Sequence, residues 1–507
     1  MLRPITRWQV AGCLFVGWGA LVACGCGSEE SESGSGGASG ATAAQFGTGG
    51  GTVAEPEVPG MRPEPLSDDG DALFDPTRLL RIDITIPTDN GSPSSWDAIN
   101  DQAPAEECVA QQRDYFEGSF TYEGIAYDDV GTRTKGGCGS WRYLEEKPSL
   151  KLNLTWDPDE TDDDCPSERR LYGQKRLTLN NGVQDESAMR EHLAYRFYRA
   201  VGIPAPRTAA IQVYVNGEYY GIYQLIESIE RRFLRRWFNT SFGKGALYEG
   251  SYWCDFLTGE DSDPEDGSCW EREFELDSCD DEPDPEDDLQ FFEADGVTPQ
   301  DPWQFLEDLI ATLEDIQDSG RYFPVIGETV DWEPFLTFWA ASSIIIDWDG
   351  YAQWQNNFRI YHDPPTDLWY FIPWGTDQTW SEVEAGTGGW FGRGDTGGAA
   401  NFGIFEPGGD VARLCAEATG TDASGRTCME RYAEELYRQL EIFESIDWSS
   451  EIDAWSDLLD AAMQGSDPHR EYTYSTWQNN VQDLRDFAES RASAVRSELS
   501  DAGYSSP

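Results

Sequence analysis

The stretch that decides the fold is a pair of apolar segments flanked by acidic and amide residues. It reads Asp347-Trp-Asp-Gly-Tyr-Ala-Gln-Trp-Gln-Asn-Asn-Phe-Arg-Ile-Tyr361, then a turn, then Leu368-Trp-Tyr-Phe-Ile-Pro-Trp-Gly-Thr-Asp-Gln-Thr-Trp380. The turn is His-Asp-Pro-Pro-Thr-Asp, which is rich in turn-forming residues and joins runs of aromatic and β-branched side chains. The segment 347–380 is therefore predicted to form a β-hairpin.

Folding this hairpin brings polar side chains from its two open ends together. The first strand is preceded by two carboxylates and two amides, and a third carboxylate follows the second strand: Asp347, Asp349, Asn356, Asn357 and Asp377. Carboxylate and amide oxygens are the ligands that Mg²⁺ uses beside nucleotide phosphates. The pattern predicts a magnesium-phosphate site.

Composition excludes some classes of function. The chain has 507 residues, enough for one large two-lobed domain or two to three smaller ones, and its 20 Trp argue against wholesale disorder. Against 36 basic residues stand 94 acidic ones, a formal net charge of -58. Such a charge repels nucleic-acid phosphates, so we expect no nucleic-acid partner. A solvated acidic surface is a simpler reading than selection of a basic substrate.

The N-terminus has the pattern of an export signal. Arg3 and Arg7 precede a short apolar stretch that ends in Leu21-Val-Ala-Cys24, which resembles the bacterial lipobox. We expect residues 1–23 to be a lipoprotein signal peptide and Cys24 to be lipidated. Residues 24–70, rich in Gly, Ser and acidic residues, are expected to be a disordered tether. The expected location is the bacterial cell envelope, as an outer-membrane lipoprotein facing the periplasm or cell surface, held to the membrane through the lipid alone.

Eight cysteines lie beyond the signal and anchor, an even number that suits disulfide bonds outside the cytoplasm. Cys415 and Cys428 bracket a short Gly/Ser/Thr-rich loop and are the pair we expect to be bonded. With three His and no Cys-x-x-Cys motif, a structural zinc site is not expected.

Residues 71–230 are predicted to be rich in strands. Strands are expected at 79–86 and within 115–134, followed by a glycine-rich turn at 131–139. In Lys147-Pro-Ser-Leu-Lys-Leu-Asn-Leu154, a period of two places Lys147 and Lys151 on one face and three leucines on the other. A helix capped within 185–187 and ending near 201 carries Glu191 at the edge of its apolar stripe. A hairpin around Asn216-Gly217 ends just before Glu227.

Residues 231–507 are predicted to be mainly helical. Helices are expected at 303–318, 332–346, 428–443, 447–463 and 474–499, with a mobile glycine-rich loop at 386–409. The acidic insert 254–288 contains cysteines and prolines and offers ligands for Ca²⁺. Its spacing does not match an EF-hand, and we favour a solvated acidic loop.

The order of these elements parallels the plan of protein kinases, in which a small sheet lobe and a helical lobe hold the nucleotide between them. Residues 72–380 resemble the spore coat protein H (CotH) kinase family. Besides the hairpin, four blocks carry the resemblance: Val130–Gly136, Lys147–Lys151, a block from Leu177 to Ala205 that includes Arg190-Glu191, and Val213–Glu227. The resemblance implies an α+β, atypical kinase-like two-lobed fold, with a sheet-rich N-lobe and a mainly helical C-lobe.

The resemblance also implies an activity, the transfer of the γ-phosphoryl group of ATP to Ser or Thr of a surface or secreted protein, with Mg²⁺ or Mn²⁺. It implies that Lys147, with Lys151 as a substitute, neutralises the nucleotide phosphates and is held by Glu191. Lys135 in the first block is a further nucleotide-binding candidate.

The remaining roles implied by the resemblance lie around the hairpin. Asp349 would orient and deprotonate the acceptor hydroxyl, with Asp347 as the competing choice. Asp377 and Asn357, or Asn356, would ligate the metal. Glu227 is assigned to the hinge near the adenine, with a salt bridge as the alternative reading.

One departure from the family pattern bears on activity. Family members commonly have Trp-Asp-x-Asp at the end of the hairpin, whereas Trp374 here is followed by Gly375. A glycine has no side chain to ligate a metal, so either Asp377 carries the metal alone or the protein is a pseudokinase. Two alternatives therefore stay open: a non-catalytic surface module that binds calcium or a protein partner, and a nucleotide-dependent transferase of another group.

Overall fold

The computed structural model describes most of the chain after the N-terminal 60 residues. The described ranges are 61–63, 65–103, 113–137, 139–156, 169–238, 246–250, 254–257, 270–272, 303–319, 332–363, 366–381, 403–405 and 407–506. The predicted signal peptide, the predicted lipidation site Cys24, most of the tether and most of the acidic insert lie outside these residues, as does most of the glycine-rich segment 386–409. None of the described helices is both long and apolar enough to cross a membrane.

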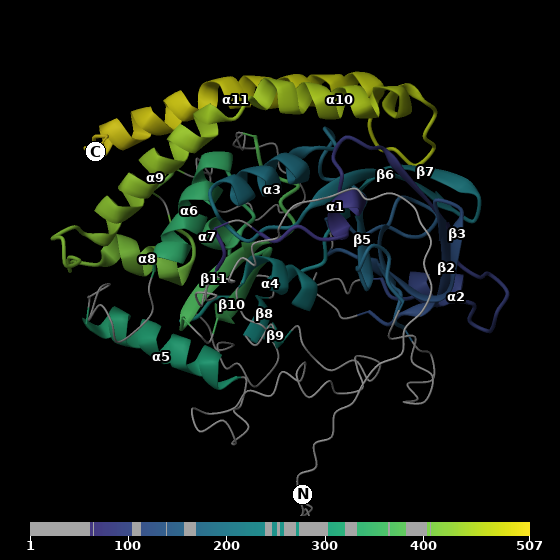
Figure 1. Ribbon diagram of the computed structural model, residues 1–507, viewed down its shortest axis with the longest axis horizontal. Helices are drawn as coiled ribbons and strands as arrows, with labels where there is room; N and C mark the ends of the chain where they lie inside the picture. The colour runs from purple at the N-terminus through teal and green to yellow at the C-terminus, as the bar shows by residue number, and fades with distance from the viewer. Residues whose placement is uncertain are drawn as a thin grey trace, which may run out of the picture. The chain divides into compact units, whose positions relative to one another are not determined.

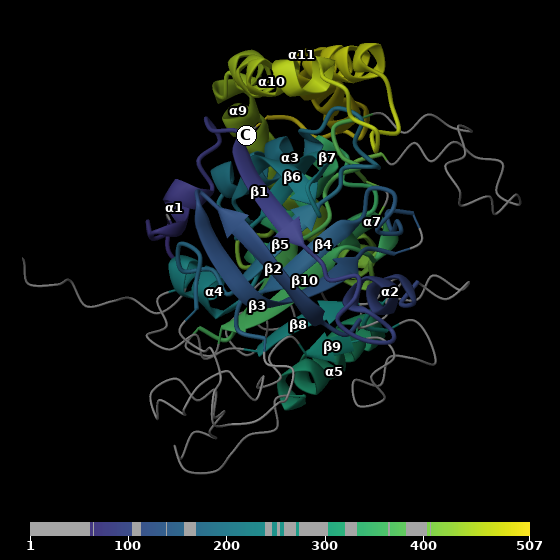
Figure 2. The same ribbon diagram turned by 90° about the vertical axis from the view of Figure 1, so that its right-hand side faces the viewer.

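The N-terminal half of the described chain is built around a closed barrel of seven strands, ordered β1-β2-β3-β4-β5-β7-β6 (Figure 2). All neighbouring strands are antiparallel except β1 and β6, which run parallel and close the barrel. The strands are β1 (Leu80–Thr85), β2 (Phe116–Tyr122), β3 (Ile125–Lys135), β4 (Ser149–Asn153), β5 (Arg176–Asn180), β6 (Thr208–Val215) and β7 (Glu218–Ile226).

Alternation along these strands fills the barrel with apolar side chains. Leu150 and Leu152 of β4 and Leu177 and Leu179 of β5 are buried in one cluster with apolar residues from β1, β6 and β7. The opposite face of β4 and β5 therefore carries their polar side chains, and Arg133 and Lys135 of β3 lie on that face too. Short helices α1 (Gly70–Leu73) and α2 (Ser95–Asn100) accompany the barrel.

The predicted glycine-rich turn at 131–139 begins later than expected. Residues 131–135 continue β3 and pair with β4, with Lys135 opposite Ser149. Two threonines and an arginine in this segment favour an extended backbone, and the ladder with β4 overrides the single glycine. The turn starts at Gly136, whose φ of +105° requires glycine.

The hairpin after helix α3 (Arg190–Ala200) agrees with the sequence-based prediction, but the helix starts later than the predicted cap at 185–187, with Met189 as its N-cap. The apolar stripe is buried, as expected, and Asp185 accepts a hydrogen bond from the backbone N–H of Arg190 at 2.8 Å. Asn216 and Gly217 join β6 to β7 with φ values of +50° and +84°, the positive pair that a two-residue hairpin turn needs.

The predicted hairpin of residues 347–380 is present as β10 (Phe358–Asp363) and β11 (Leu368–Pro373), with Phe358 paired to Pro373. It belongs to a four-stranded sheet in the order β11-β10-β8-β9, which the sequence did not predict (Figure 1). The added strands are β8 (Ala246–Gly250) and the three-residue β9 (Trp270–Arg272).

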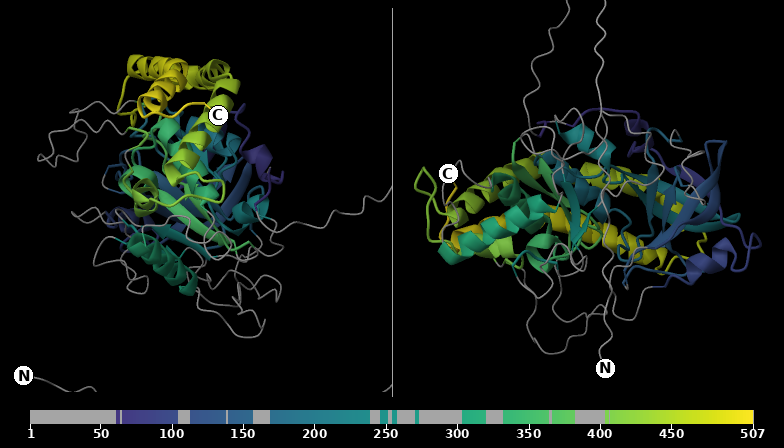
Figure 3. Two further views of the ribbon diagram at one scale, coloured as in Figure 1. Left: turned by 90° about the vertical axis from the view of Figure 1, so that its left-hand side faces the viewer. Right: turned by 90° about the horizontal axis from the view of Figure 1, so that it is seen from below.

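Helices account for most of the rest of the described chain. The five long predicted helices are found within two residues of their expected ends, as α5 (Gln304–Ser319), α6 (Glu333–Ile345), α9 (Cys428–Ser445), α10 (Trp448–Gln464) and α11 (Tyr474–Asp501). The shorter α4 (Arg231–Trp237), α7 (Tyr351–Trp354) and α8 (Asp410–Glu417) were not predicted. Helices α10 and α11 run side by side above α3 in Figure 1, and Figure 3 shows the same yellow helices from two further sides.

The predicted disulfide is confirmed. Cys415 of α8 is bonded to Cys428 at the start of α9, with their Cα atoms 5.3 Å apart. The mixed content of helices and strands agrees with the α+β class expected from the sequence.

Candidate active site

The first part of the site is the loop between α6 and β10. Helix α6 ends at Ile346, a β-branched residue held at a φ of +53°, and Gln355, Asn357 and Trp380 also have positive φ values. Residues other than glycine rarely take this conformation, and such strain is concentrated at functional sites. These positive φ values mark the loop between α6 and β10, together with Trp380, as a candidate functional site.

Asp347 is buried at the start of this loop. Its carboxylate accepts a hydrogen bond from the Tyr198 hydroxyl at 2.6 Å, and that hydroxyl also lies 2.8 Å from Ser342 Oγ. A Cβ at Gly350 would lie 2.9 Å from the Asp347 carboxylate, so only glycine lets the loop turn this closely. Asp347 is thus enclosed by α3, α6 and its own loop.

Asp349 lies among three side-chain amides. Its Oδ1 accepts from Asn356 Nδ2 at 3.1 Å, and its Oδ2 accepts from Asn357 Nδ2 at 2.7 Å and from Gln378 Nε2 at 3.3 Å. The β10–β11 hairpin brings these groups together because it aligns the residues before one strand with those after the other. Asp377 is close enough to Asp349 to interact with it electrostatically. The clustering expected from the hairpin is present.

The second part of the site comes from the barrel and α3. Lys135, at the end of β3, interacts electrostatically with Glu191 of α3 and with Asp377, and its ammonium lies 5.8 Å from the Trp374 ring centroid. Glu191 is buried and accepts a hydrogen bond from Asn180 Nδ2 of β5 at 2.7 Å. One ammonium therefore links the barrel to the hairpin loop.

The structure corrects the choice of lysine. Lys147 was expected beside Glu191, but its ammonium lies 5.3 Å from the Tyr223 ring centroid, and the charged groups that act on it are Asp467, Arg470 and Glu471. Strand β4 begins only at Ser149, so the alternation inferred from the sequence does not extend to position 147.

Lys151, the expected substitute, lies two residues further along β4. It is opposite Arg133 of β3 and Thr178 of β5, whereas Ser149 is the β4 residue opposite Lys135. Lys135 is thus the lysine that the structure brings to Glu191.

Glu227 is engaged in a buried ion pair. Its Oε1 is 2.7 Å from Arg207 Nη2 and 3.4 Å from Arg236 Nε, and its Oε2 accepts from the Arg207 backbone N–H at 3.1 Å. Both carboxylate oxygens are therefore occupied by arginine, which agrees with the salt-bridge reading and not with an adenine contact. The partner arginines are 20 and 9 residues away, and no sequence pattern connects them to Glu227.

Helix α3 is anchored by the C-terminal helices at the end that carries Glu191. The Trp455 indole donates to the Ala188 carbonyl at 3.0 Å, and the Trp477 indole donates to the Ser187 carbonyl at 2.9 Å. The His192 ring stacks on Trp455 with centroids 3.8 Å apart. Sequence reasoning assigned no role to α10 and α11, and buried tryptophans in both were the available signal.

Burial dominates the electrostatics of the site. Burial raises the pKa of Asp347 and of Asp349 to about 7, and the Asp377 charge adds to both shifts. The pKa values of Glu191 and Asp377 are also raised by burial, while Lys135 opposes both shifts. Burial lowers the pKa of Lys135, and Glu191 and Asp377 counter this. Lys135 thus acts on two of these carboxylates, Glu191 and Asp377, which when both are ionised carry more negative charge than one ammonium neutralises.

The donor atoms suit a hard divalent cation. Carboxylate and amide oxygens are what Mg²⁺ and Mn²⁺ prefer. Asn357 donates through Nδ2 to Asp349 and to the Gly375 carbonyl, which leaves its amide oxygen as the atom that could ligate. Across the described ranges, no three or more His, Cys, Asp or Glu side chains already form a group that could hold a metal. The donor atoms therefore fit Mg²⁺ or Mn²⁺. Binding of the ion requires these carboxylate and amide side chains to move closer to one another.

Gly375 has a structural reason. Its φ is +57°, and a Cβ there would lie 2.9 Å from both Cγ and Oδ1 of Asn357. The Asn357 amide occupies the space that a side chain at position 375 would need. The absence of the usual aspartate is therefore coupled to the position of Asn357.

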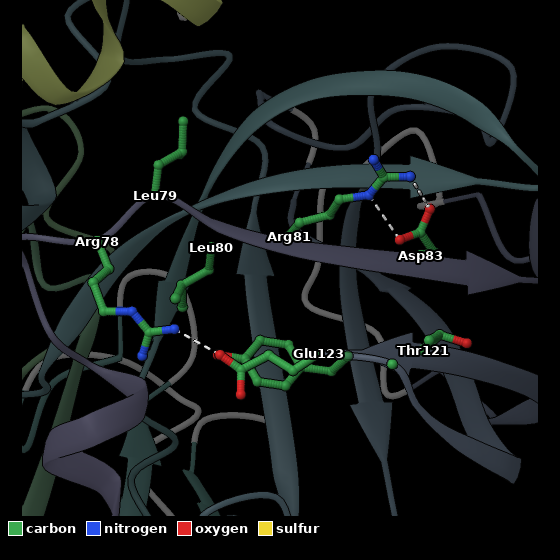
Figure 4. A pocket seen from close by; sticks show the side chains of 9 residues that line it. Arg78, Leu79, Leu80, Arg81, Asp83, Thr121 and Glu123 are labelled. Carbon is green, nitrogen blue, oxygen red and sulfur yellow. Dashed lines mark hydrogen bonds and ion pairs between the residues drawn. The ribbon is translucent and has the colours of Figure 1, made fainter.

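A separate concave surface of about 390 Å³ lies on the barrel and shares no residue with this site (Figure 4). It is formed where β1 meets the β2–β3 turn. Its charged side chains pair with each other, Arg78 with Glu123 at 2.6 Å and Arg81 with Asp83 at 2.7 Å. It contains no carboxylate cluster of the kind found at residues 347–377.

Comparison with known proteins decides the family. The family described as "CotH kinase protein" matches residues 133–495, which is more than half of the chain. The chain belongs to the CotH kinase family. The match begins within β3, two residues before Lys135, and runs through α10 into α11. Compared with the range 72–380 that carried the resemblance in sequence, the match starts later and extends further toward the C-terminus.

Relatives are distant. The chain is 24% identical over 213 residues to Inner spore coat protein H of Bacillus subtilis (strain 168), covering 42% of this chain and 52% of that protein. It is 24% identical over 296 residues to Invasin CotH2 of Rhizopus delemar, covering 57% of this chain and 45% of that protein. The chain spans about half the length of these two relatives.

One solved structure that resembles this chain is described as a kinase. "Crystal structure of A Helicobacter pylori proinflammatory kinase CtkA" is 10% identical and covers 69% of this chain and 95% of that chain, with a TM-score of 0.25. A TM-score this low supports no conclusion about the fold or function of this chain.

The raised pKa values predict how stability depends on pH. Asp347 has a folded-state pKa of about 7, against about 3.9 when unfolded. The folded protein therefore holds this proton more tightly, so its contribution is complete below about pH 4 and is lost as the pH rises through 7. Metal-free protein should have a higher Tm at pH 5.5 than at pH 8, by a few degrees.

The matched variant is Asp347→Asn, which keeps an acceptor for the Tyr198 hydroxyl and cannot ionise. Calorimetry should show a smaller fall in Tm between pH 5.5 and pH 8 for this variant. Mn²⁺ should raise the wild-type Tm more at pH 8, because metals bind deprotonated carboxylates. Equal slopes for wild type and variant would show that Asp347 is already ionised at pH 5.5.

Proposed function

We propose that this protein is an active kinase that transfers the γ-phosphoryl group of ATP to a Ser or Thr hydroxyl of another protein. Membership of the CotH kinase family supports a kinase-like protein. The observation that carries the finer proposal is the meeting of Lys135 with Glu191 and Asp377 beside Asp349. A cation, its carboxylate holder, a base and a metal-ligating carboxylate are the groups that phosphoryl transfer requires.

Lys135 is proposed to bind the nucleotide phosphates, in place of the Lys147 and Lys151 expected from sequence. Its ammonium is a compact charge on a flexible stem, which suits phosphate oxygens. Glu191 would keep that stem extended into the site, and α10 and α11 would keep Glu191 in place through the start of α3. These residues stabilise charge and perform no covalent chemistry.

Asp349 is proposed as the base for the acceptor hydroxyl. Three amides fix its carboxylate, and a pKa of about 7 suits proton transfer near neutral pH. The acceptor oxygen would form a bond to the γ-phosphorus, the bond from that phosphorus to the bridging oxygen of ADP would break, and the hydroxyl proton would go to Asp349. Asp347, enclosed with Tyr198, is assigned to hold the loop.

Asp377 and Asn357 are proposed to hold Mg²⁺ or Mn²⁺, with Asn356 as an auxiliary ligand. A bound divalent ion supplies positive charge at the phosphate oxygens. The excess of buried carboxylates over cations near Lys135 supports this assignment. Calcium bound to the acidic insert belongs to residues that the structure does not describe.

We further propose that the kinase is exported and anchored to the cell envelope through Cys24, on the outer membrane. The lipobox-like Leu21–Cys24 supports this, and so does the Cys415–Cys428 disulfide, because such bonds persist mainly in oxidising compartments. The acceptor would then be a surface or secreted protein.

A second candidate function is a pseudokinase that binds calcium or a protein partner. It is favoured by Gly375, which removes one expected metal ligand, and by the lack of a ready-made metal group among the described side chains. A transferase of another group to the same acceptors would share the nucleotide site. Label from the γ-phosphate of ATP separates the kinase from both.

The choice of lysine can be tested with radiolabelled ATP and Mn²⁺ on purified protein, using a generic protein acceptor or the protein itself. Lys135→Met should lower transfer about 100-fold, because it removes a preorganised charge at the phosphates. The matched control Lys147→Met changes another buried lysine outside the site and should keep transfer within about threefold. Loss with Lys147→Met alone would restore the original assignment.

The role of the base follows in the same assay. Asp349→Ala should lower transfer by about 100-fold or more while leaving the ATP-dependent thermal shift in place, because the base acts on the acceptor and not on nucleotide binding. Loss of the thermal shift together with transfer would place Asp349 in nucleotide or metal binding instead.

At position 375, restoring the aspartate of the family pattern is expected to lower activity and not to raise it. Gly375→Asp restores the family pattern, yet it should lower transfer, because any Cβ at φ +57° collides with Asn357. Gly375→Ala separates the steric effect from the charge and should lower transfer to a similar degree. Higher transfer in Gly375→Asp than in wild type would mean that the missing carboxylate limits activity.

A further inference from the structure

Asn180 joins four elements at the centre of the proposed site. It is the last residue of β5 and is buried, with 3% of its surface exposed. Its Nδ2 donates to Glu191 Oε2 of α3 at 2.7 Å, and its side chain also lies close enough to Asp377 after β11 to lower the pKa of that carboxyl. Its Oδ1 accepts from the Ser149 hydroxyl of β4 at 3.0 Å.

Ser149 fixes which way the Asn180 amide faces. Ser149 Oγ accepts a hydrogen bond from the Asn181 backbone N–H at 2.9 Å, so its own proton is directed to Asn180 Oδ1. A hydroxyl has one proton to donate, and a carboxamide has an acceptor end and a donor end. With its oxygen held by Ser149, Asn180 presents its N–H groups to the two carboxylates.

An uncharged asparagine at position 180 suits the two neighbouring carboxylates. Glu191 and Asp377 repel each other, and the Lys135 ammonium counters the raised pKa of both. An uncharged N–H donor can hold two buried carboxylates close together without adding charge, whereas Asp would add a further negative charge and Leu would leave both unpaired. Ser149 is also paired with Lys135 in the β3–β4 ladder. The residue that orients the Asn180 amide therefore lies beside the lysine.

We propose that Asn180 is a positioning residue of the kinase site, and that its carboxamide sets the spacing of Glu191 and Asp377 on either side of Lys135. This inference rests on the proposed function. The inference goes beyond that function, because it assigns the alignment of the barrel and α3 with the hairpin loop to Asn180. We expect Asn180 to contact neither ATP nor the acceptor protein. The neighbouring Asn181 does a different task, since its Nδ2 donates to the Ser140 and Lys147 carbonyls.

The test compares Asn180→Leu with Asn181→Leu in the full-length protein. Both variants replace a buried carboxamide with an apolar side chain of similar size, so both should lose stability. Only Asn180→Leu should lower kcat for phosphoryl transfer, by about 100-fold, as expected when reacting groups are misplaced by about 1 Å. The KM for ATP should change less than about threefold, while Asn181→Leu should keep kcat within about threefold.

A second variant keeps the proposal open to refutation if Asn180→Leu does not fold. Ser149→Ala removes the hydroxyl that orients the amide and should lower kcat about fivefold to tenfold, again with little change in KM. Equal kcat in Asn180→Leu and Asn181→Leu, or wild-type kcat in Ser149→Ala, would overturn the positioning role while leaving the kinase function intact.

Failure of the kinase function would look different. Wild-type protein that binds MnATP, seen as quenching of tryptophan fluorescence, but transfers no phosphate would refute the kinase. The Asn180 role would then be decided by affinity: it survives only if Asn180→Leu weakens MnATP binding at least tenfold more than Asn181→Leu does. Wild-type protein that neither binds MnATP nor transfers phosphate would overturn both proposals.

Discussion

The structure of the site depends on one buried ammonium, that of Lys135, surrounded by more carboxylates than it can neutralise. Removing charged groups from water is costly unless they are paired and hydrogen-bonded. The barrel supplies the lysine at the end of β3, α3 supplies Glu191, and the hairpin supplies Asp377. Tyr198 and the amides of Asn180, Asn356 and Asn357 satisfy the remaining oxygens. The fold holds these charges together because each comes from a separately anchored element.

Local patterns were sufficient to predict much of this fold. The β10–β11 hairpin and the five long helices follow from alternation, helical periodicity and turn residues, which are properties of short segments. The same patterns brought Asp349 and Asn357 together correctly, because both lie within one hairpin. The Cys415–Cys428 disulfide was predictable for the same reason, since a short loop joins the two cysteines.

Errors arose where pairing between distant segments decides the outcome. The sequence favoured Lys147, and only the register of β3 against β4, with Lys135 opposite Ser149, shows that Lys135 is the lysine near Glu191. The pairing of Glu227 with Arg207 and the anchoring of α3 by Trp455 depend on contacts across 20 and 267 residues. From the sequence, Gly375 is a missing metal ligand. In the structure, the Asn357 side chain occupies the space that a side chain at position 375 would need.

We propose that Lys135 and Asp377 form the two sides of a nucleotide site. A crystal structure of the protein with Mn²⁺ and a non-hydrolysable ATP analogue tests it most directly, because anomalous scattering locates the metal without assumptions. We expect phosphate oxygens at the Lys135 ammonium and Mn²⁺ held by the phosphates, Asp377 and the Asn357 amide oxygen. Phosphates bound at Lys147, or Mn²⁺ bound at a site that excludes Asp377, would contradict it.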